Sequence, residues 1–465
     1  MTQQHQFDPV ILREYDVRGT VDKNLKAVDA LALGRAFGTM VLRAGGKRIV
    51  VGYDGRTHSP AFEAALVEGL TSTGLSVERI GIGPTPMLYF SVHHMDADAG
   101  VMVTGSHNPS DQNGFKMLLS KRLPDGGPVY GAKIRELAVL AQAGDFEKGH
   151  GSSQKIDVSE AYIERLLQDY QGTKGLNVVW DNGNGAAGDI LERLTKRLTG
   201  EHTILFGDID GNFPNHHPDP TVPENLADLQ RAVVEKKADM GIAFDGDADR
   251  IGAVDCQGRI LAGDQLLALY AREVLQDHKG ATIIADVKAS QVLFDSIAKD
   301  GGKPLMWKTG HSLIKVKMSE TKSPLAGEMS GHIFFADKYY GFDDALYCGI
   351  RLISLVESFG VSLADLRDTL PETFSTPEIR FDVDEARKFK VVEEVKARLQ
   401  AQQVKVNDTD GVRVLTDDGW WLLRASNTQA VLVARAEAKD LAGLDRLKAQ
   451  IVEALKSSGI KPPAF

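Results

Sequence analysis

Short apolar runs that end in a polar, glycine-containing loop recur along this chain. Each run is typical of a buried strand, and stretches with apolar residues at helical spacing lie between several of them, as at Ser59 to Thr73 and Pro223 to Lys237. This alternation predicts α/β units. Ligands of such sheets bind at the carboxyl ends of the strands, so the closing loops are the places to look for chemistry. The runs are RIVVGYDGR (48–56), GVMVTGSHNP (100–109), LNVVWDNGNGAAG (176–188), MGIAFDGDADR (240–250) and TIIADVKAS (282–290).

The pattern changes near residues 369–378. Beyond this point apolar and polar residues alternate, as in antiparallel strands, and a helical stretch ends the chain, which predicts a smaller α+β domain. The polar stretch 143–155 and the turn from Asp255 to Gly258 mark two further boundaries. Because 465 residues is about three times the usual domain size, we expect three or four domains.

Composition narrows the classes of function. A net charge of −10 and a pI near 5.7 argue against a broad surface for nucleic acid or membranes, so any phosphate site must be built locally. Cys256 and Cys348 lie far apart without metal-ligand spacing, and we expect ordinary thiols. The N-terminal segment lacks the apolar core of a signal peptide and no apolar run reaches membrane-spanning length, so we expect a cytoplasmic location.

Ser106 follows an apolar strand directly, between Gly105 and the turn-forming pair Asn108 and Pro109. An exposed nucleophile is presented in this way. The GxSxG elbow of a hydrolase is absent, and His107 is not an obvious base for its neighbour. The segment alone therefore predicts either an activated nucleophile or a plain turn.

Asp245, Asp247 and Asp249 occupy alternate positions after another apolar strand. Unpaired, they would repel and raise one another's pKa, so a hard cation such as Mg²⁺ is their natural partner. An EF-hand would need glycine and glutamate where this chain has Arg250 and Cys256. Two alternatives remain open: a solvated acidic turn, and a haloacid-dehalogenase-like start with Asp245 as nucleophile, although Asp249 stands where Thr or Val is usual.

Two more loops combine hydrogen-bonding groups. GEMSGH (327–332) sets a carboxylate, a hydroxyl and an imidazole between glycines, which suits the hydroxyls of a sugar. RASNT (424–428) offers the guanidinium fork of Arg424 beside Ser, Asn and Thr donors, which suits a phosphate group. A hydrogen-bonded turn after a strand would have the same sequence.

In this order, TGSHNP, DGDADR, GEMSGH and RASNT resemble the signature loops of the α-D-phosphohexomutase family, most closely of its phosphomannomutase/phosphoglucomutase branch. The resemblance covers nearly the whole chain, beginning at REYDVRG (13–19). It implies an α/β fold of four domains in a heart-shaped arrangement: three related α/β mixed-sheet domains and a C-terminal α+β domain. The expected domains are 1–150 with the phosphoserine loop, 151–255 with the metal-binding loop, 256–370 with the sugar-binding loop and 371–465 as a phosphate-binding lid.

The same resemblance implies roles for individual residues. Ser106 is expected to carry the phosphate and to bind Mg²⁺ together with Asp245, Asp247 and Asp249, and a hexose 1,6-bisphosphate is the expected activator and intermediate. The residues expected at the reacting centre are Ser106, Lys116, Arg250, His332, His311, Arg18 and His107. The residues expected to bind the substrate are Tyr15, Lys288, Gly310, Glu328, Ser330, Arg424, Ser426, Asn427 and Thr428.

The expected reaction is the reversible transfer of phosphate between O1 and O6 of mannose and glucose phosphates. The bisphosphate must turn over before it returns a phosphate to Ser106, so the C-terminal domain that carries Arg424 is expected to open and close as a hinged lid. A site that binds the sugar in two orientations reads C2 weakly, so both epimers are expected as substrates. Phosphosugars are the expected partners, without nucleic acid or membrane, and the chain is expected to be a monomer or weak dimer.

Three alternatives remain beside this reaction. A phosphoglucosamine mutase has a sugar loop closer to GEQSGH, so Met329 favours the glucose/mannose branch. An aspartyl-phosphate phosphotransferase would use Asp245 and leave Ser106 structural. A silent sugar-phosphate binding protein would keep Arg424 and Glu328 for recognition. The intact Ser106 together with all three aspartates counts against it.

The chain departs from the family's pattern directly after RASNT. Gln429 and Ala430 stand where Glu or Thr followed by Pro is common. Proline restricts the backbone, so its loss predicts a looser phosphate loop and affects affinity more than mechanism.

Overall fold

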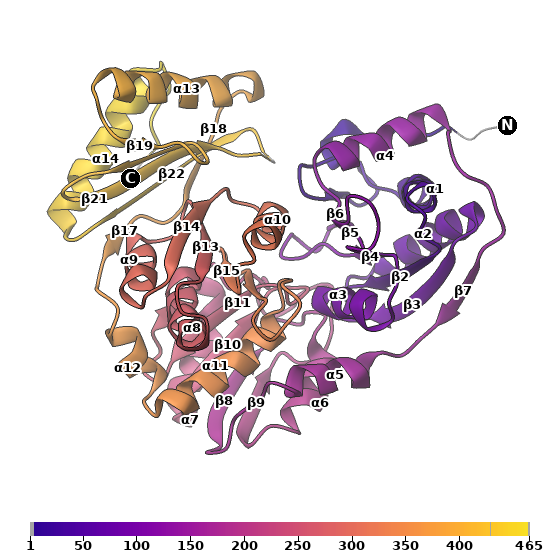
Figure 1. Ribbon diagram of the computed structural model, residues 1–465, viewed down its shortest axis with the longest axis horizontal. Helices are drawn as coiled ribbons and strands as arrows, with labels where there is room; N and C mark the ends of the chain where they lie inside the picture. The colour runs from indigo at the N-terminus through magenta and orange to yellow at the C-terminus, as the bar shows by residue number, and fades with distance from the viewer. Residues whose placement is uncertain (1–3, 428, 464–465) are drawn as a thin grey trace.

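The computed structural model describes residues 4–427 and 429–463. In this part of the chain the strands form four sheets, which follow one another along the sequence from indigo to yellow in Figure 1. The first and fourth domains stand as two lobes on either side, and the second and third connect them below (Figure 1). Three mixed sheets with helices and a C-terminal antiparallel sheet confirm the predicted fold class.

The first sheet has the strand order β1-β5-β4-β2-β3-β7, with β6 beside β5. β2 runs parallel to β3 and β4, and β5 runs antiparallel to both β4 and β1. The helix predicted at Ser59 to Thr73 is present as α2. β7 extends this sheet beyond the division predicted at residue 150. The elements are η1 (Pro9–Ile11), β1 (Val17–Thr20), α1 (Ala27–Arg43), β2 (Arg48–Tyr53), α2 (Ser59–Thr73), β3 (Ser76–Ile82), α3 (Thr85–His94), β4 (Ala99–Val103), β5 (Gln112–Leu119), β6 (Gly127–Pro128), α4 (Ala132–Ala143) and β7 (Ser152–Lys155).

The second sheet has the order β12-β11-β10-β8-β9. β8 runs parallel to β9 and β10, whereas β10, β11 and β12 form an antiparallel meander. The helix predicted at Pro223 to Lys237 is present as η2 followed by α7, and β12 lies beyond the division predicted at residue 255. The elements are α5 (Ser159–Leu167), β8 (Leu176–Asp181), α6 (Gly188–Thr195), β9 (Gly200–Leu205), η2 (Pro223–Leu226), α7 (Ala227–Lys236), β10 (Met240–Phe244), β11 (Ile251–Asp255) and β12 (Ile260–Leu261).

The third sheet has the order β14-β13-β15-β16 and repeats the same plan. β13 runs parallel to β14 and β15, and β16 closes the edge in the antiparallel direction. The loop that follows β10 contacts the loops that follow β4 and β15, so the carboxyl ends of these three strands lie close together. The elements are α8 (Gly263–Asp277), β13 (Thr282–Asp286), α9 (Gln291–Lys299), β14 (Lys303–Trp307), α10 (His311–Thr321), β15 (Leu325–Gly327), β16 (Ile333–Phe335), α11 (Ala345–Phe359) and α12 (Leu363–Asp368).

The fourth sheet is antiparallel, with the order β17-β22-β21-β20-β19 and β18 beside β22. The predicted alternation and final helix are therefore confirmed. The sequence interpretation assigned no helix to α13, which begins at the N-cap Asp384 and buries Val391, Val392 and Val395. The elements are β17 (Phe374–Ser375), β18 (Ile379–Asp382), α13 (Glu385–Ala401), β19 (Val406–Asn407), β20 (Val412–Leu415), β21 (Gly419–Ala425), β22 (Val431–Ala438) and α14 (Leu441–Lys456).

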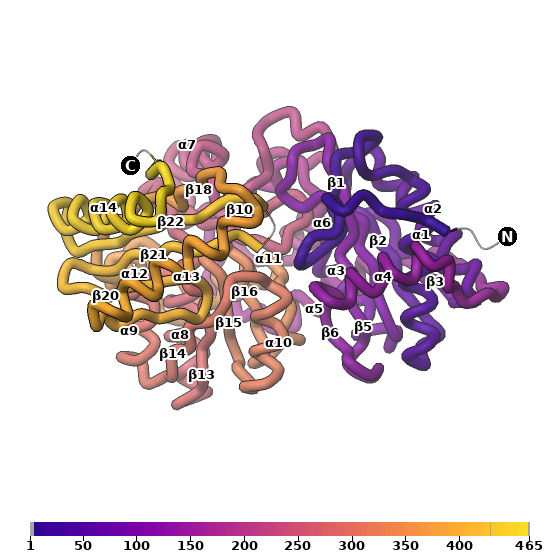
Figure 2. Tube along the Cα trace, turned by 90° about the horizontal axis from the view of Figure 1, so that it is seen from above, coloured from indigo at the N-terminus to yellow at the C-terminus, as the bar shows by residue number. Residues whose placement is uncertain are grey.

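Apolar packing separates a large body from the fourth domain. One continuous cluster joins the first three domains and includes Leu88, Trp180 and Tyr270. The fourth domain has its own core around Trp421, and a small cluster around Trp420 joins it to the third domain. Seen from above, the first and fourth domains lie at opposite ends of the molecule (Figure 2). A domain with a core of its own can move as a unit against the other three. Among the described helices, none has the length and apolar character needed to cross a membrane.

Candidate active site

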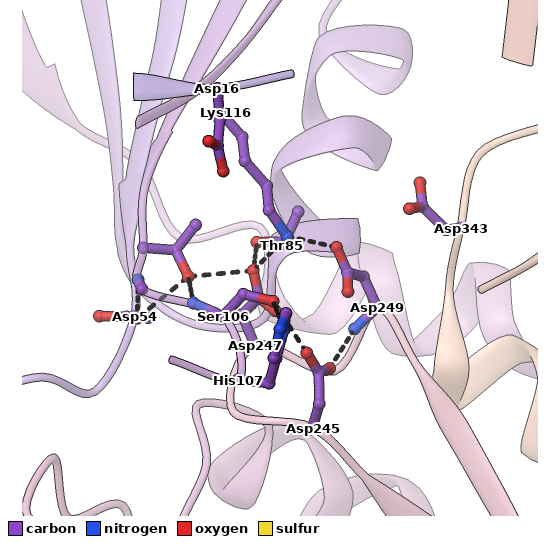
Figure 3. Close-up of polar contacts among 12 residues, drawn as sticks. Asp16, Asp54, Thr85, Ser106, His107, Lys116, Asp245, Asp247, Asp249 and Asp343 are labelled. Atoms are coloured by element: carbon purple, nitrogen blue, oxygen red, sulfur yellow. Dashed lines mark hydrogen bonds and ion pairs between the residues drawn. The ribbon is translucent and has the colours of Figure 1, made fainter. Parts of the chain in front are cut away.

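Ser106 lies in the loop that follows β4, at the carboxyl end of the first sheet. Its backbone is left-handed, with φ at +50°, which costs a residue with a side chain about 1–2 kcal/mol. The side chain is buried, not exposed as its place in a strand-end turn predicted. Its Oγ donates to Asp245 Oδ2 at 2.9 Å and lies 3.2 Å from His107 Nδ1 (Figure 3). Contacts from the surroundings must therefore hold this strained loop in place.

Asp245, Asp247 and Asp249 follow β10 and gather beside Ser106 (Figure 3). One oxygen from each lies within 4.8 Å of the others, and all three side chains are buried. Among the described residues, Asp247 Oδ1 and Asp249 Oδ1 find no hydrogen-bond partner. Buried carboxylates with unused oxygens fit a hard divalent cation, so these residues can hold one.

Lys116 reaches the same carboxylates from β5 of the first domain. Its Nζ lies 2.8 Å from Asp247 Oδ2 and also contacts Asp249 Oδ2. Burial raises the pKa of Asp245, and the charges of Asp247 and Asp249 raise it further. Burial also acts to raise the pKa of Asp247, but the ammonium of Lys116, the Thr85 hydroxyl and the charge of Arg18 together bring the net pKa below the usual value. The concentrated negative charge at Asp245 is therefore costly without a further cation.

Arg250, His332 and His311 form a second group next to the three carboxylates. Arg250 Nε donates to His332 Nε2 at 3.0 Å, and the rings of His332 and His311 stack with centroids 5.4 Å apart. His332 Nδ1 lies 3.0 Å from Asp343 Oδ2 and 3.5 Å from Asp249 Oδ1. A neutral His332 that accepts at Nε2 carries its proton on Nδ1, toward these carboxylates. Burial lowers the pKa of His311, which favours its neutral form.

Arg18 and His107 flank Ser106 on its other sides. Arg18, on β1, donates from Nη1 to Gly105 O at 2.5 Å and from Nη2 to Asp16 Oδ2 at 2.6 Å. Burial lowers the pKa of His107, and the charges of Arg250 and Arg18 lower it further, so its ring is held neutral. The structure thus brings all the residues predicted for the reacting centre into one region.

Tyr15 connects three domains at one hydroxyl. It donates to Thr309 O at 2.9 Å and accepts from Asn427 Nδ2 at 2.9 Å. Gly310 N donates to Glu328 Oε1 at 2.7 Å. At a φ of +131°, a side chain on Gly310 would place its Cβ 2.6 Å from the Tyr15 ring, so only glycine fits there. Burial raises the pKa of Tyr15 to about 12 and keeps the hydroxyl protonated.

Arg424 projects from β21 toward the same region. Its Nε donates to Asp410 Oδ2 at 3.0 Å, and that oxygen also accepts from Thr309 N at 3.0 Å. Ser426 follows Arg424, and its Oγ accepts from Gln429 N at 3.2 Å. Asp410 therefore links the fourth domain to the loop before α10. Thr428, also predicted to bind substrate, lies outside the described residues.

Lys288 and Ser330 complete the predicted substrate set. Lys288 Nζ donates to Glu378 Oε2 at 2.9 Å and lies 3.7 Å from Asp286 Oδ2. That Asp286 oxygen accepts from Thr309 Oγ1 at 3.3 Å, so Lys288 borders the Thr309 loop. Ser330 is half-buried, two residues beyond Glu328 in the same loop.

Comparison with known protein families agrees with this geometry. Residues 9–147, 160–258 and 262–374 match the phosphoglucomutase/phosphomannomutase alpha/beta/alpha domains I, II and III. Residues 378–454 match the C-terminal domain of the same family. The chain belongs to the phosphoglucomutase/phosphomannomutase family.

Individual members of the family are similar over almost the whole chain. The phosphomannomutase/phosphoglucomutase of Pseudomonas putida is 44% identical over 438 residues, which is 94% of each chain. A solved phosphoglucomutase/phosphomannomutase family protein from Burkholderia thailandensis has 43% identity and a TM-score of 0.92, covering 99% of each chain. The N-acetylphosphoglucosamine mutase of Aspergillus fumigatus, solved with GlcNAc-6P and magnesium, shares the fold at 16% identity and a TM-score of 0.62, covering 98% of this chain and 96% of that one.

The loop that departs from the family pattern is held by contacts of its own. Gln429 Oε1 accepts from Arg380 Nη1 at 2.9 Å, and the Gln429 carbonyl accepts from Lys388 Nζ at 2.9 Å. Lys388 is buried on α13. These contacts hold the residue before Ala430, which stands where the family pattern has proline.

Several residues that shape this family site escaped the sequence interpretation. Asp54 and Arg56 lie in the loop of GYDGR at the end of a strand. This position indicated a functional loop but gave no role for either residue. The others gave no such signal, and their importance depends on which loops meet in space. These residues are Asp16, Thr85, Asp343, Glu378 and Asp410.

Proposed function

We propose that this chain is a phosphohexomutase that moves phosphate reversibly between O1 and O6 of glucose and mannose phosphates. The observation that carries the proposal is the contact between Ser106 Oγ and Asp245 Oδ2 at 2.9 Å, where the nucleophile loop meets the loop of three carboxylates. The phosphomannomutase/phosphoglucomutase activity named for the Pseudomonas putida relative supports it. The reaction class is intramolecular phosphotransfer.

The first half-reaction transfers the phosphoryl group from Ser106 to O6 of a hexose 1-phosphate. The bond from phosphorus to Ser106 Oγ breaks and a bond from phosphorus to O6 forms. The proton of the O6 hydroxyl passes to a base, and Ser106 Oγ recovers a proton. After the hexose 1,6-bisphosphate turns over, the same steps run in reverse with the phosphate at O1, which regenerates the phosphoserine.

Proton transfer at the sugar oxygen is the proposed task of His332, with Lys116 and His311 beside it. His332 Nε2 holds a lone pair that Arg250 Nε engages at 3.0 Å. When Arg250 turns to the phosphoryl oxygens, Nε2 is ready to take a proton. Arg18 adds positive charge around the phosphate on Ser106, and the neutral ring of His107 adds a hydrogen-bonding group.

Asp245, Asp247 and Asp249 are the proposed magnesium ligands, together with an oxygen on Ser106. Their buried and partly unpaired oxygens fit the ion. Bound Mg²⁺ supplies charge neutralisation for the transferring phosphoryl group. The magnesium in the Aspergillus fumigatus relative supports this assignment.

Recognition of the sugar and of its second phosphate is proposed for the region around Tyr15. Glu328 and Ser330 would bind sugar hydroxyls, and Lys288 and Gly310 border them. The non-reacting phosphate would bind the loop of the fourth domain, at Arg424, Ser426, Asn427 and Thr428. The separate apolar core of the fourth domain supports its proposed motion as a lid.

Four features remain predictions beside this reaction. The domains between the predicted divisions at 150, 255 and 370 are proposed as mechanical units, with the first division moved past β7 and the second past β12. A hexose 1,6-bisphosphate is the proposed activator. A cytoplasmic location and a monomer or weak dimer are expected.

Replacing Arg424 with lysine should weaken binding of the non-reacting phosphate. Lysine cannot reproduce a planar fork, and the loss of a charge-assisted hydrogen bond, about 1.5–3 kcal/mol, corresponds to a rise in KM of about tenfold to a hundredfold. The change in KM is measured by steady-state kinetics with glucose 1-phosphate. Arg446→Lys is the matched control, because Arg446 pairs with Asp418 on the exposed surface of the same domain. An unchanged KM for Arg424→Lys with a large fall in kcat would instead place Arg424 at the reacting phosphate.

The enzyme should accept both glucose 1-phosphate and mannose 1-phosphate. To use one Ser106 for both ends, the sugar must bind in two opposite orientations, in which the O3 and O4 hydroxyls occupy similar places and C2 does not. A group paired firmly with C2 in one orientation would be unpaired in the other, at a cost of about 1–3 kcal/mol. The values of kcat/KM for the two epimers should therefore agree within about a hundredfold.

A coupled assay of 6-phosphate formation, with a trace of the matching hexose 1,6-bisphosphate, tests both this specificity and the proposed function. A preference of about ten-thousandfold for one epimer would show that C2 is read after all. Clear selectivity for glucosamine 1-phosphate would favour the phosphoglucosamine mutase alternative.

A further inference from the structure

Arg56 lies in the loop between β2 and α2, and only 1% of it is exposed. All five N–H groups of its guanidinium are used. Nε donates to Asp54 Oδ2 at 3.1 Å. The other four donate to backbone carbonyls of the nucleophile loop: Nη2 to Ser106 O at 2.8 Å and Asn108 O at 2.6 Å, and Nη1 to Pro109 O at 2.5 Å and Gln112 O at 3.0 Å.

Asp54 holds the amino-terminal side of the same loop (Figure 3). Its Oδ2 accepts from Gly105 N at 2.9 Å and from Thr104 Oγ1 at 3.0 Å. Its Oδ1 accepts from Ser59 Oγ at 2.6 Å and from Arg56 N at 3.1 Å. The ion pair of Asp54 and Arg56 therefore forms a clamp, in which hydrogen bonds hold the backbone immediately before and after the nucleophile.

The packing around Arg56 leaves its guanidinium no room to move. A Cβ on Gly105 would lie 2.1 Å from Arg56 Nε, so the guanidinium rests directly against the backbone before Ser106. From the second domain, the Phe213 ring covers the guanidinium with its centroid 5.2 Å from Cζ. A Cβ on Gly211 would lie 2.4 Å from Arg56 Cα. The domain that carries the three carboxylates thus also seals the clamp on Ser106.

Ser106 needs such a clamp because its backbone is left-handed. With φ at +50°, the loop would relax toward a commoner conformation if its carbonyls were released, and Oγ would turn away from Asp245. Buried carbonyls without partners are costly, so few side chains can replace the clamp. A lysine ammonium has three donors at one point and cannot span four carbonyls.

We propose that Arg56 and Asp54 are positioning residues for the phosphotransfer, which set the direction of Ser106 Oγ without touching the substrate. This inference rests on the proposed function, because it requires Ser106 to be the nucleophile. It adds two residues to the reaction that act through the backbone of the loop from Gly105 to Gln112. Their replacement should affect the transfer step, because the sugar and the non-reacting phosphate bind elsewhere.

The first experiment compares Arg56→Lys with wild-type enzyme in steady-state kinetics. A displacement of about 1 Å at a nucleophile costs on the order of a hundredfold in rate, so kcat should fall by about that factor. KM should stay within about threefold of wild type, because substrate contacts are intact. Arg351→Lys is the matched control: Arg351 is equally buried but pairs with Asp337 and Glu273 in the third domain. The Arg351→Lys enzyme should be less stable than wild type but have an unchanged kcat.

A rescue experiment separates positioning from general damage. Arg56→Ala leaves a cavity lined by the same carbonyls, and added guanidinium ion should restore part of its kcat, whereas equal concentrations of ammonium should not. If Arg56→Lys does not fold, Asp54→Asn takes its place. Both Asp54 oxygens accept hydrogen bonds, so the NH₂ group of asparagine would face another donor in place of one of these oxygens. For Asp54→Asn, kcat should therefore fall while KM stays unchanged.

Phosphorylation of Ser106, read by intact mass after incubation with glucose 1,6-bisphosphate, keeps the two proposals apart. If wild-type enzyme turns over without phosphate on Ser106, the proposed function fails. The positioning role is overturned if wild-type enzyme is phosphorylated on Ser106 but the folded Arg56 or Asp54 variants keep kcat within about threefold of the wild-type value. It is also overturned if their kcat falls no more than that of Arg351→Lys.

Discussion

Replacing Ser106 with alanine is expected to remove nearly all mutase activity. The hydroxyl is the only group of this side chain that can accept the phosphate, and its Oγ stands 2.9 Å from Asp245 Oδ2. Loss of a nucleophile costs on the order of 10⁴-fold or more in kcat, and residual binding does not replace it. The coupled assay for glucose 6-phosphate measures the loss, and circular dichroism checks that the variant is folded.

Ser110→Ala is the matched control for this prediction. Ser110 lies in the same loop but is exposed, so its replacement should leave kcat unchanged. Near-normal turnover by a folded Ser106→Ala enzyme, with no neighbouring residue phosphorylated in its place, would contradict the assignment. Treatment of the phosphoenzyme with hydroxylamine distinguishes the remaining alternative, because an acyl phosphate on Asp245 reacts and a phosphoserine does not.

Removing the metal should have an effect of similar size. Dialysis against a chelator is expected to lower kcat by about a thousandfold or more, since a bound cation contributes several kcal/mol to stabilising the transferring phosphoryl group. Magnesium should restore the activity. Full activity in excess chelator, after metal has been stripped and its absence verified, would refute a role for the ion.

Asp249→Asn should reproduce this loss while leaving the fold intact. The pKa of Asp249 is raised, by burial first and then by the charge of Asp247, so the folded protein tolerates a neutral group there. The unfolding temperature of the metal-free variant should therefore not fall, and added magnesium should no longer raise it. Asp255→Asn is the control: Asp255 is equally buried in the second domain but binds Arg259, so magnesium dependence should persist. A variant Asp249→Asn with normal magnesium-dependent turnover would remove this residue from the metal site.

The sequence predicted functional residues best where they directly follow the end of a strand. Ser106 and the aspartates after β10 could be predicted because a buried parallel strand has one carboxyl end, and the polar residues placed there converge on the ends of neighbouring strands. The α/β units followed from the same alternation, and the resemblance to the family implied their division among three domains. Periodicity also located α2 and α7, whose apolar faces cover their sheets.

Other parts of the site depend on loops that meet only after folding. Arg56 is one arginine in a polar loop, and nothing in its local sequence shows that it bonds four carbonyls some fifty residues away. Asp410 likewise gains its importance from two groups, Thr309 N and Arg424, supplied by different domains. Such roles require the tertiary structure because sequence spacing carries no information about which loops touch.

The central claim, that phosphate travels through Ser106, is tested most directly by the mass of the intact enzyme during turnover. Enzyme freed of phosphate and supplied with magnesium and glucose 1,6-bisphosphate should gain the mass of one phosphoryl group, and peptide mapping should place it on Ser106. Addition of excess glucose 6-phosphate should return the enzyme to its starting mass as bisphosphate forms. An enzyme that interconverts the phosphosugars while its mass never changes, or that carries the group on Asp245, would contradict the account.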